Sequence, residues 1–338
     1  PDDYGTIQEA ITAAADGDSV IVRPGTYVEN INFLGKAITV ASEQGPEVTV
    51  IDGSNPPDPD FGSVVTLESG EGPGSTLEGF TLTGGSGYYL PEYDRNYGGG
   101  IFITGSSPLI TGNIITGNSA TGSGGGIISV DASPVIADNT VADNSAFWAG
   151  GIMVGNPTVP TPSATVRGNI VRDNHADSYG GGIGLNVCTA LVRNNVVTHN
   201  TATNGGAGIW IWPNADASIS DNVIAENEAG TIGGGIGIGN GPAAPEITNN
   251  LVLMNTANTG GGGLSCYQST PTLFNNTIME NSAPSGGGLY CEVDSTLTIL
   301  NTIFWNNTAT TGKEIWIGTT SSPSTLSISY SDIEGGVD

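Results

Sequence analysis

Apolar and polar positions alternate along this chain in a pattern that repeats about every 26 residues. Each copy carries an apolar residue, two spacers and an asparagine, followed two residues later by an alanine, as in Val197-x-x-Asn200 and Ala202. A glycine-rich turn then leads into a short apolar segment, which begins at Ile101, Ile127, Ile152, Ile183, Ile209, Ile236, Leu264, Leu289 or Ile315. A period this regular predicts a solenoid in which each copy forms one rung.

Three short strands are predicted for each rung, because apolar and polar residues alternate over three segments. In the rung that begins at Ile101, strand one covers 101–103, strand two ends at Ile110 and strand three centres on Ile115. Turns are expected at Asn113 and Asn118. When the rungs stack, the apolar columns must line the interior, and the alanine column must lie at a tight corner.

The asparagines form two columns, one after each of the last two strands. We interpret both as structural, because asparagine tolerates left-handed backbone angles and stacked amides can hydrogen-bond between rungs. The first column is expected to contain Asn113, Asn139, Asn169, Asn195, Asn222, Asn250, Asn276 and Asn301.

The two ends of the solenoid are predicted to differ. The segment Thr6–Ala15 is the one amphipathic helix, with Ile7 and Ile11 on its apolar face, and it should cap the N-terminal end of the core. No comparable segment follows Ile315. We therefore expect the C-terminal rung to be covered by a missing domain, a neighbouring subunit or axial self-association.

A family resemblance rests on two sets of motifs. The opening Thr6-Ile7-Gln8, Gly17-Asp18 and Pro24-Gly25-Thr26-Tyr27 resembles the entry segment of many secreted bacterial β-helix proteins. The repeats resemble those of the pectate-lyase-like superfamily, and their Gly-Gly-Gly-Ile and Phe304-x-x-Asn307 punctuation is similar to the repeats of chlamydial polymorphic outer-membrane proteins.

The resemblance covers almost the whole chain and implies an all-β fold, a single-stranded right-handed parallel β-helix of about twelve rungs. Residues 1–18 would form the N-terminal cap and residues 19–338 the β-helix. Family geometry implies that any polysaccharide binds the outer face of strand one. The resemblance is weak for function, because the superfamily holds lyases, hydrolases, epimerases, adhesins and inert scaffolds.

Charge narrows the choice of partners. The 338 residues include 33 acidic and 7 basic side chains, for a formal net charge of −26. Nucleic acid is excluded as a partner, because phosphate binding needs clustered Lys and Arg. Anionic polysaccharides are disfavoured for the same reason, unless calcium ions bridge the polysaccharide and the acidic protein. No apolar run is long enough to span a membrane. Cys266 and Cys291 should be neighbouring buried thiols, although a disulfide between them is geometrically allowed.

Catalytic candidates are sparse. Polyuronate lyases of the superfamily need a base and cations, but the outward positions of strand one hold one acid and no base. The remaining polar group lies in the middle rungs and comprises Asp173, His175, Arg193 and His199. A histidine beside carboxylates can act as a general base or a metal ligand. The alternative is a surface salt-bridge ladder.

Calcium is a candidate ligand of one acidic loop. Asp52, Asp58 and Asp60 fall within nine residues, and calcium prefers several close oxygen ligands. Solvated turn carboxylates are the alternative interpretation, because the loop matches no known calcium repeat.

Aromatic side chains supply the remaining candidate site. We expect Asn186 and five aromatics to face outward on strand one or its immediate extension, namely Trp210, Trp212, Tyr267, Tyr290 and Trp316. Exposed aromatics have no core role, and glycines in the same columns would leave shallow gaps in which sugar rings could stack. A subunit contact or simple cross-rung packing are the alternatives.

The sequence therefore favours a secreted or cell-surface protein with a non-catalytic role, either structural or in binding a neutral polysaccharide or cell-surface glycan. One alternative is a polysaccharide lyase or hydrolase with an atypical site in the middle rungs. The other is a self-associating, filament-like extracellular protein.

Overall fold

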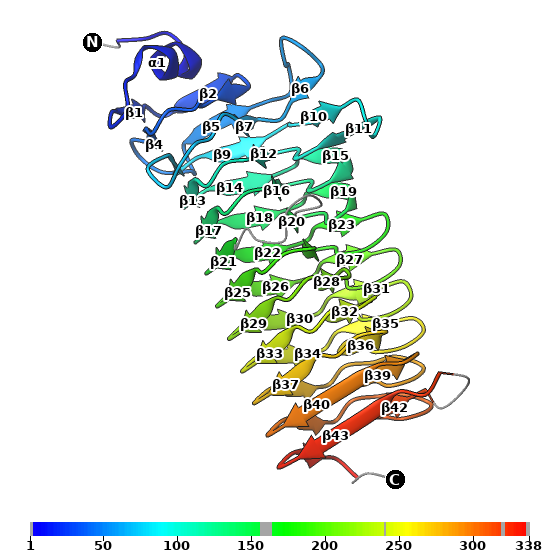
Figure 1. Ribbon diagram of the computed structural model, residues 1–338. Coiled ribbons are helices and arrows are strands. Elements are labelled where there is room, and N and C mark those ends of the chain that lie inside the picture. The colour runs from blue at the N-terminus through cyan, green and yellow to red at the C-terminus, as the bar shows by residue number, and fades with distance from the viewer. Residues whose placement is uncertain (1–2, 156–163, 240, 319–321, 336–338) are drawn as a thin grey trace.

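The computed structural model describes residues 3–155, 164–239, 241–318 and 322–335. The chain coils into a rod of stacked rungs, with the N-terminal and C-terminal residues at opposite ends (Figure 1). Nearly all strands pair in parallel with the equivalent strand of the next rung. The predicted parallel β-helix is confirmed.

Sheet C contains strand one of each rung, at the positions that the glycine-rich turns predict. Its eleven strands stack in chain order. They are β3 (Ile31–Asn32), β7 (Val65–Leu67), β12 (Ile101–Thr104), β16 (Ile127–Val130), β20 (Ile152–Gly155), β24 (Ile183–Asn186), β28 (Ile209–Ile211), β32 (Ile236–Ile238), β36 (Leu264–Tyr267), β39 (Leu289–Glu292) and β42 (Ile315–Ile317).

Sheet A contains strand two of each rung and has twelve strands. They are β1 (Ser19–Val22), β4 (Thr39–Ser42), β8 (Thr76–Glu78), β13 (Leu109–Thr111), β17 (Val135–Ala137), β21 (Thr165–Arg167), β25 (Leu191–Arg193), β29 (Ser218–Ser220), β33 (Glu246–Thr248), β37 (Thr272–Phe274), β40 (Thr296–Leu300) and β43 (Thr325–Ser329).

Sheet B contains strand three and also has twelve strands, which matches the expected number of rungs. They are β2 (Gly25–Val28), β5 (Thr49–Asp52), β9 (Thr81–Thr83), β14 (Ile114–Thr116), β18 (Thr140–Ala142), β22 (Ile170–Arg172), β26 (Val196–Thr198), β30 (Val223–Ala225), β34 (Leu251–Leu253), β38 (Thr277–Met279), β41 (Ile303–Trp305) and β44 (Asp332–Ile333).

Two smaller sheets lie outside the three strands that the sequence predicts for each rung. Sheet E is parallel and contains the alanine column. Its strands are β15 (Ser119–Ser123), β19 (Ser145–Trp148), β23 (His175–Ala176), β27 (Thr201–Ala202), β31 (Glu228–Ala229) and β35 (Thr256–Ala257). Sheet D is antiparallel, interrupts the repeat near its start, and consists of β6 (Phe61–Gly62), β10 (Gly87–Leu90) and β11 (Arg95–Tyr97).

The core is a continuous apolar column inside the rod, as the alternation predicts. Its side chains include Ile101, Ile115, Val171 and Val197, none of which is exposed to solvent. Cys266 and Cys291 lie in register on neighbouring strands, and both are buried free thiols. Burial raises the pKa of each thiol.

Both asparagine columns are buried ladders that join the rungs. The Asn200 Oδ1 accepts from the backbone N–H of Asn174 at 3.1 Å and from its Nδ2 at 3.0 Å. The Nδ2 of Asn174 also donates to the Val141 carbonyl at 2.9 Å. Each amide therefore satisfies buried backbone groups in the turns, where no strand partner can reach them.

The expected place of Asn301 in the first ladder is wrong. Asn276 donates its backbone N–H to the hydroxyl of Thr302, so Thr302 continues the ladder. Asn301 is exposed and has a φ of +50°, like Asn275 and Asn249 in the preceding rungs. The residues with left-handed backbone angles thus lie one position before the ladder residues. Because Asn301 and Thr302 are both polar, the sequence alone does not show which of the two belongs to the ladder.

The N-terminal helix α1 (Ile7–Ala13) is confirmed as a cap on the core. Thr6 and Glu9 form a reciprocal capping box, and Ile7 and Ile11 are buried against the first rungs. At the other end, the apolar residues of the last described rung are only partly buried, and these are Ile315, Leu326, Ile328 and Ile333. What covers this end stays a prediction.

Candidate functional site

The outer face of sheet C carries the predicted aromatic residues, because side chains alternate across each strand. Parallel pairing places Gly184, Trp210 and Gly237 in one outward column. The same column continues through Ser265, Tyr290 and Trp316. Sequence reasoning therefore identified the face correctly.

The predicted exposure of Trp210 is wrong, since only 1% of its surface is accessible to solvent. Its indole ring occupies the space that Gly237 leaves, so a Cβ at Gly237 would overlap it. The ring of Tyr179 covers it from outside at a centroid distance of 4.4 Å. The expected gap between the rungs is filled, and Trp210 belongs to a second apolar layer outside the sheet.

Trp212 is half-buried, and its ring points toward the preceding rung, whereas the ring of Trp210 points toward the following one. A Cβ at Gly184 would lie 2.9 Å from its Cζ3 atom. Its ring meets that of Trp210 edge-on, with centroids 6.2 Å apart. The two tryptophans thus fill the glycine gaps of the rungs on either side, and Trp212 keeps part of its ring accessible.

The remaining aromatics divide in the same way. Tyr290 is 9% exposed and stacks on Trp316 at 4.5 Å, so its predicted exposure is also wrong. Tyr267 and Trp316 are half-buried, as is Asn186 on the same face. Three rings with accessible surface therefore remain, those of Trp212, Tyr267 and Trp316.

The electrostatics of this face favour a neutral ligand. From β12 to β42 its outward positions contain one acid, Glu292, and no Lys, Arg or His. Burial and the nearby Glu292 raise the pKa of Tyr290 to about 12, so its phenol stays protonated at neutral pH. The face can stack on a ligand and hydrogen-bond it, and Glu292 is the one acidic side chain on it that could accept a proton.

The histidine candidates lie elsewhere, at the corner between sheets B and E. His175 Nε2 lies 3.3 Å from Asp177 Oδ1, and His199 Nε2 lies 2.9 Å from Glu226 Oε2. Asp173 follows β22 in the rung next to His199, where its carboxylate pairs with Arg172 at 2.5 Å. All of these side chains are about half exposed, which is typical of screened surface pairs.

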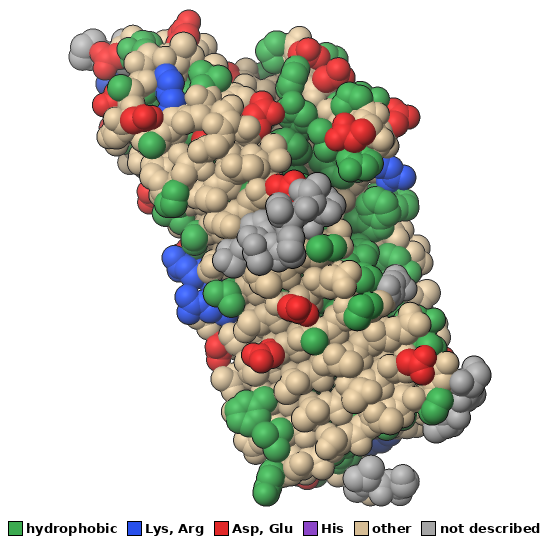
Figure 2. Space-filling model, in the orientation of Figure 1, with side chains coloured by type: hydrophobic (Ala, Val, Ile, Leu, Met, Phe, Trp, Pro, Cys, Tyr) green, Lys and Arg blue, Asp and Glu red, His purple; other side chains and the backbone are tan. Residues whose placement is uncertain are grey.

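Arg193 is not brought to this corner. It lies on β25 in sheet A, in register with Arg167, whereas His175 lies on β23 in sheet E and His199 follows β26 in sheet B. Figure 2 shows Lys and Arg side chains gathered at the edge of the molecule near β21 and β25. The predicted group is therefore split between sheet A and the corner, and its members at the corner each have a local partner.

Two of the three calcium candidates, Asp52 and Asp58, accept hydrogen bonds from backbone groups of their own turns. Asp52 Oδ1 accepts from the backbone N–H of Ser54, and Asp58 Oδ1 accepts from that of Asp60, both at 3.0 Å. Within the described parts of the chain, no three His, Cys, Asp or Glu side chains are grouped to hold a metal ion. A calcium site in this loop stays a prediction.

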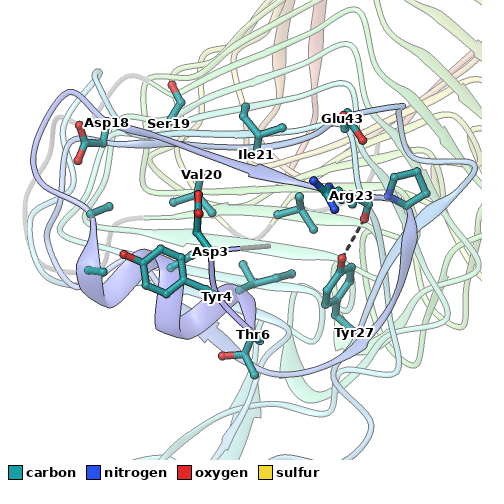
Figure 3. Close-up of a pocket in the computed structure, with 17 residues that line it drawn as sticks. Asp3, Tyr4, Thr6, Asp18, Ser19, Val20, Ile21, Arg23, Tyr27 and Glu43 are labelled. Carbon is teal, nitrogen blue, oxygen red and sulfur yellow. Dashed lines mark hydrogen bonds between the residues drawn. The ribbon is translucent and has the colours of Figure 1, made fainter. Parts of the chain in front are cut away.

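A hollow lies at the capped end, between α1 and β1 (Figure 3). It measures about 800 Å³ and is lined by core residues such as Ile7, Val20 and Val22. The Tyr27 hydroxyl donates to the Arg23 carbonyl at its side. This hollow is formed by residues at the N-terminal end of the apolar core, and none of the predicted site residues lines it.

Sequence reasoning missed the apolar layer that covers the N-terminal half of the sheet C face. Tyr88 of β10 stacks on Phe102 at 4.4 Å, and Leu90 and Trp212 pack against the same cluster as Met153. Hydrophobic side chains accordingly gather beside β10, β11 and β15 in Figure 2. The available signal was the aromatic segment 88–97, which interrupts the repeat.

The comparisons with known proteins address the fold. A family model described as "Right handed beta helix region" matches residues 74–224 and 177–332. No curated protein sequence matches the chain. Among the described residues, no helix has the length and apolar character to cross a membrane. The similarity to polymorphic outer-membrane proteins stays a prediction.

A solved structure, the A-module of mannuronan C-5 epimerase AlgE6 from Azotobacter vinelandii, is similar at a TM-score of 0.36 and 12% identity. The alignment covers 98% of this chain and 95% of that chain. The likeness is too loose to bear on function. Because the family model covers well over half of the sequence, and because the strands stack into the expected parallel sheets, this chain belongs to the family of right-handed β-helix proteins.

Proposed function

We propose that this protein is a non-catalytic module that binds a neutral polysaccharide or cell-surface glycan on the outer face of sheet C. We further propose that it is secreted or displayed at the cell surface. The observation that carries the proposal is the set of half-exposed rings, Trp212, Tyr267 and Trp316, on a face without a cation. Rings of this kind offer apolar faces for sugar C–H groups and polar edges for hydroxyls.

The spacing of the rings suits an extended ligand. Trp212 follows β28, Tyr267 lies on β36 and Trp316 on β42, so one ring occurs at every second rung. Neighbouring strands are about 4.8 Å apart, which gives a ring repeat of roughly 10 Å along the rod. This is comparable to the length of two sugar units in an extended chain.

The buried aromatics give these rings a rigid support. Trp210 is held between Gly237 and Tyr179, and Trp212 rests edge-on against it. Tyr290 supports Trp316 in the same way through a stacked contact. A ring that is already held in place loses little conformational entropy when a ligand stacks on it.

A catalytic function has one observation in its favour, the pair formed by His199 and Glu226 at 2.9 Å. Such a pair could act as a general base in a polysaccharide lyase or hydrolase. Its exposure and its distance from the aromatic face weigh against this alternative. Release of reducing ends or unsaturated sugars by the wild type would favour it.

The experiment is a glycan-array screen combined with product analysis on the same polysaccharides. We expect binding to neutral glycans, loss of most signal in Trp212→Ala and Tyr267→Ala, and no product release. Trp305→Thr is the matched control, because Trp305 is an exposed tryptophan on sheet B. A wild type that binds no glycan and buries the sheet C face against a second chain would instead support the structural, self-associating role.

A further inference from the structure

The outer face of sheet B carries almost no charge, although the molecule as a whole is strongly acidic. One outward column runs along eight strands from β14 to β41 and contains no charged residue, its members being Ile114, Thr140, Ile170, Val196, Val223, Leu251, Thr277 and Ile303. The adjacent outward column contains one charged residue over the same strands, Arg172. None of the chain's 33 acidic residues falls in either stretch.

Large apolar side chains concentrate at the C-terminal half of this face. Trp305 is 45% exposed, and Met254 and Ile303 are each 42% exposed. We define the sheet B patch as these three residues together with the half-buried Val223, Leu251, Leu253 and Met279. It spans four strands, so it measures roughly 15 Å along the rod.

The fold does not require apolar residues at these positions. The column of Leu253, Met279 and Trp305 contains Thr116 and Thr198 in other rungs. Threonine has a high strand propensity and leaves less apolar surface in water. Clustered exposed apolar side chains commonly mark an interaction site, and Met and Trp are enriched in the centres of such sites.

Charge at the edges of the patch indicates what kind of partner fits. Glu280 and Asp221 are exposed at the turns that flank the patch, and Asp332 follows Ile303 on the next rung. A second copy would bring the same acidic rim and a net charge of −26, so repulsion opposes a dimer. A partner with basic side chains around an apolar centre is complementary in both respects.

We infer that the sheet B patch docks a protein segment whose apolar stripe is flanked by Lys or Arg side chains. The patch is much smaller than the ~800 Å² per partner of a standard protein interface. It therefore suits a single amphipathic segment rather than a whole domain surface.

The test uses the full chain and a labelled amphipathic helical peptide of leucine and lysine, with binding measured by fluorescence anisotropy. The patch variant is Met279→Thr with Trp305→Thr, because threonine already occurs in this column. Ile170→Thr is the matched control, since Ile170 is exposed on the same sheet but lies outside the patch. A leucine–glutamate peptide controls for charge, and unfolding midpoints verify that each variant is folded.

We expect the patch variant to bind the leucine–lysine peptide at least tenfold more weakly, with Ile170→Thr unchanged. Glu280→Gln with Asp221→Asn should reduce the salt dependence of binding. The inference is overturned if the wild type binds neither peptide, or if the patch variant binds as tightly as the wild type. It is also overturned by a wild-type dimer that strengthens with salt and is lost in the patch variant, because the occupant is then a second copy.

Discussion

At the scale of single residues, the ladder asparagines form buried hydrogen bonds that no apolar residue could form. Asn200 accepts two hydrogen bonds from Asn174, and its Nδ2 donates to the Val171 carbonyl at 2.9 Å. All of these groups are buried. Removal of one amide therefore leaves several polar groups without partners, each at a cost of ~1–3 kcal/mol.

We accordingly predict that Asn200→Ala lowers the free energy of unfolding by about 3 kcal/mol or more. Asn258→Ala is the control, because Asn258 is an exposed asparagine close to the same corner, and its effect should stay within about 0.5 kcal/mol. Urea unfolding followed by circular dichroism measures both. Similar midpoints for the two variants would show that the ladder contributes little.

The two neighbouring tryptophans should respond differently to truncation. Trp210→Ala opens a cavity beneath Tyr179 and should cost ~3–5 kcal/mol. Trp212→Ala removes a half-exposed ring and should cost clearly less. The comparison is made on urea unfolding midpoints, and a larger loss in Trp212→Ala would mean that the burial of the two rings is misassigned.

The residues explain where sequence reasoning succeeds and where it fails. Strand periodicity places Trp210 on the outer face, which is correct, but it carries no information about what covers that face. Coverage depends on Tyr179, which comes from a loop that precedes Trp210 by one rung. Likewise, Asn301 and Thr302 are both polar turn residues, and only the rung-to-rung hydrogen bonds show which one joins the ladder.

At the scale of elements, the second ladder ends on a charged residue. Asn307 donates from its backbone N–H and its Nδ2 to the carboxylate of Glu314, at 3.3 and 2.5 Å. The Glu314 side chain is 4% exposed. Burial raises its pKa above the ordinary value of 4.5, although the bonds from Asn307 act in the opposite direction.

This pKa shift predicts a pH dependence of stability. A raised pKa means that the folded state holds the proton more tightly than the unfolded state does. The protonated carboxyl therefore contributes to the free energy of unfolding at low pH, and this contribution is lost as the pH rises through the raised pKa. Glu314→Gln stays neutral at every pH. We therefore expect the variant to gain stability relative to the wild type as the pH rises from about 4 to 8.

Urea unfolding midpoints at a series of pH values measure this difference. A difference that is constant over the series, or that favours the wild type at high pH, would contradict a buried, proton-retaining Glu314.

Most elements follow from the repeat, and the exceptions have physical reasons. Sheets A, B and C occupy the segments that apolar alternation marks. Sheet E escapes notice because several of its strands are two residues long, as in β27, and two residues show no alternation. Sheet D pairs antiparallel and across the repeat, so β10 and β11 have no equivalent in other rungs from which to infer them.

At the scale of the whole molecule, the net charge of −26 acts against compactness. Added sodium chloride should screen repulsion among the carboxylates and raise the thermal unfolding midpoint. Thermal scans at low and high salt provide the measurement. A midpoint that falls with salt would indicate that ion pairs such as Arg167–Asp138, at 3.3 Å, outweigh the repulsion.

The rod presents two different surfaces, an aromatic one on sheet C and an aliphatic one on sheet B. Because these belong to separate sheets, substitutions on one should leave binding at the other unchanged. Trp212 and Trp305 provide the comparison, since both are tryptophans with accessible rings at these two places.

The central claim is that sheet C binds a neutral glycan, and calorimetric titration of the glycan with the strongest array signal tests it most directly. The wild type, Trp212→Ala and Trp305→Thr should be compared in the same buffer. We predict that Trp212→Ala weakens binding about tenfold or more, or ~1.4 kcal/mol, while Trp305→Thr binds like the wild type. Equal affinity in all three proteins, or loss of binding in Trp305→Thr alone, would contradict the assignment of the glycan to sheet C.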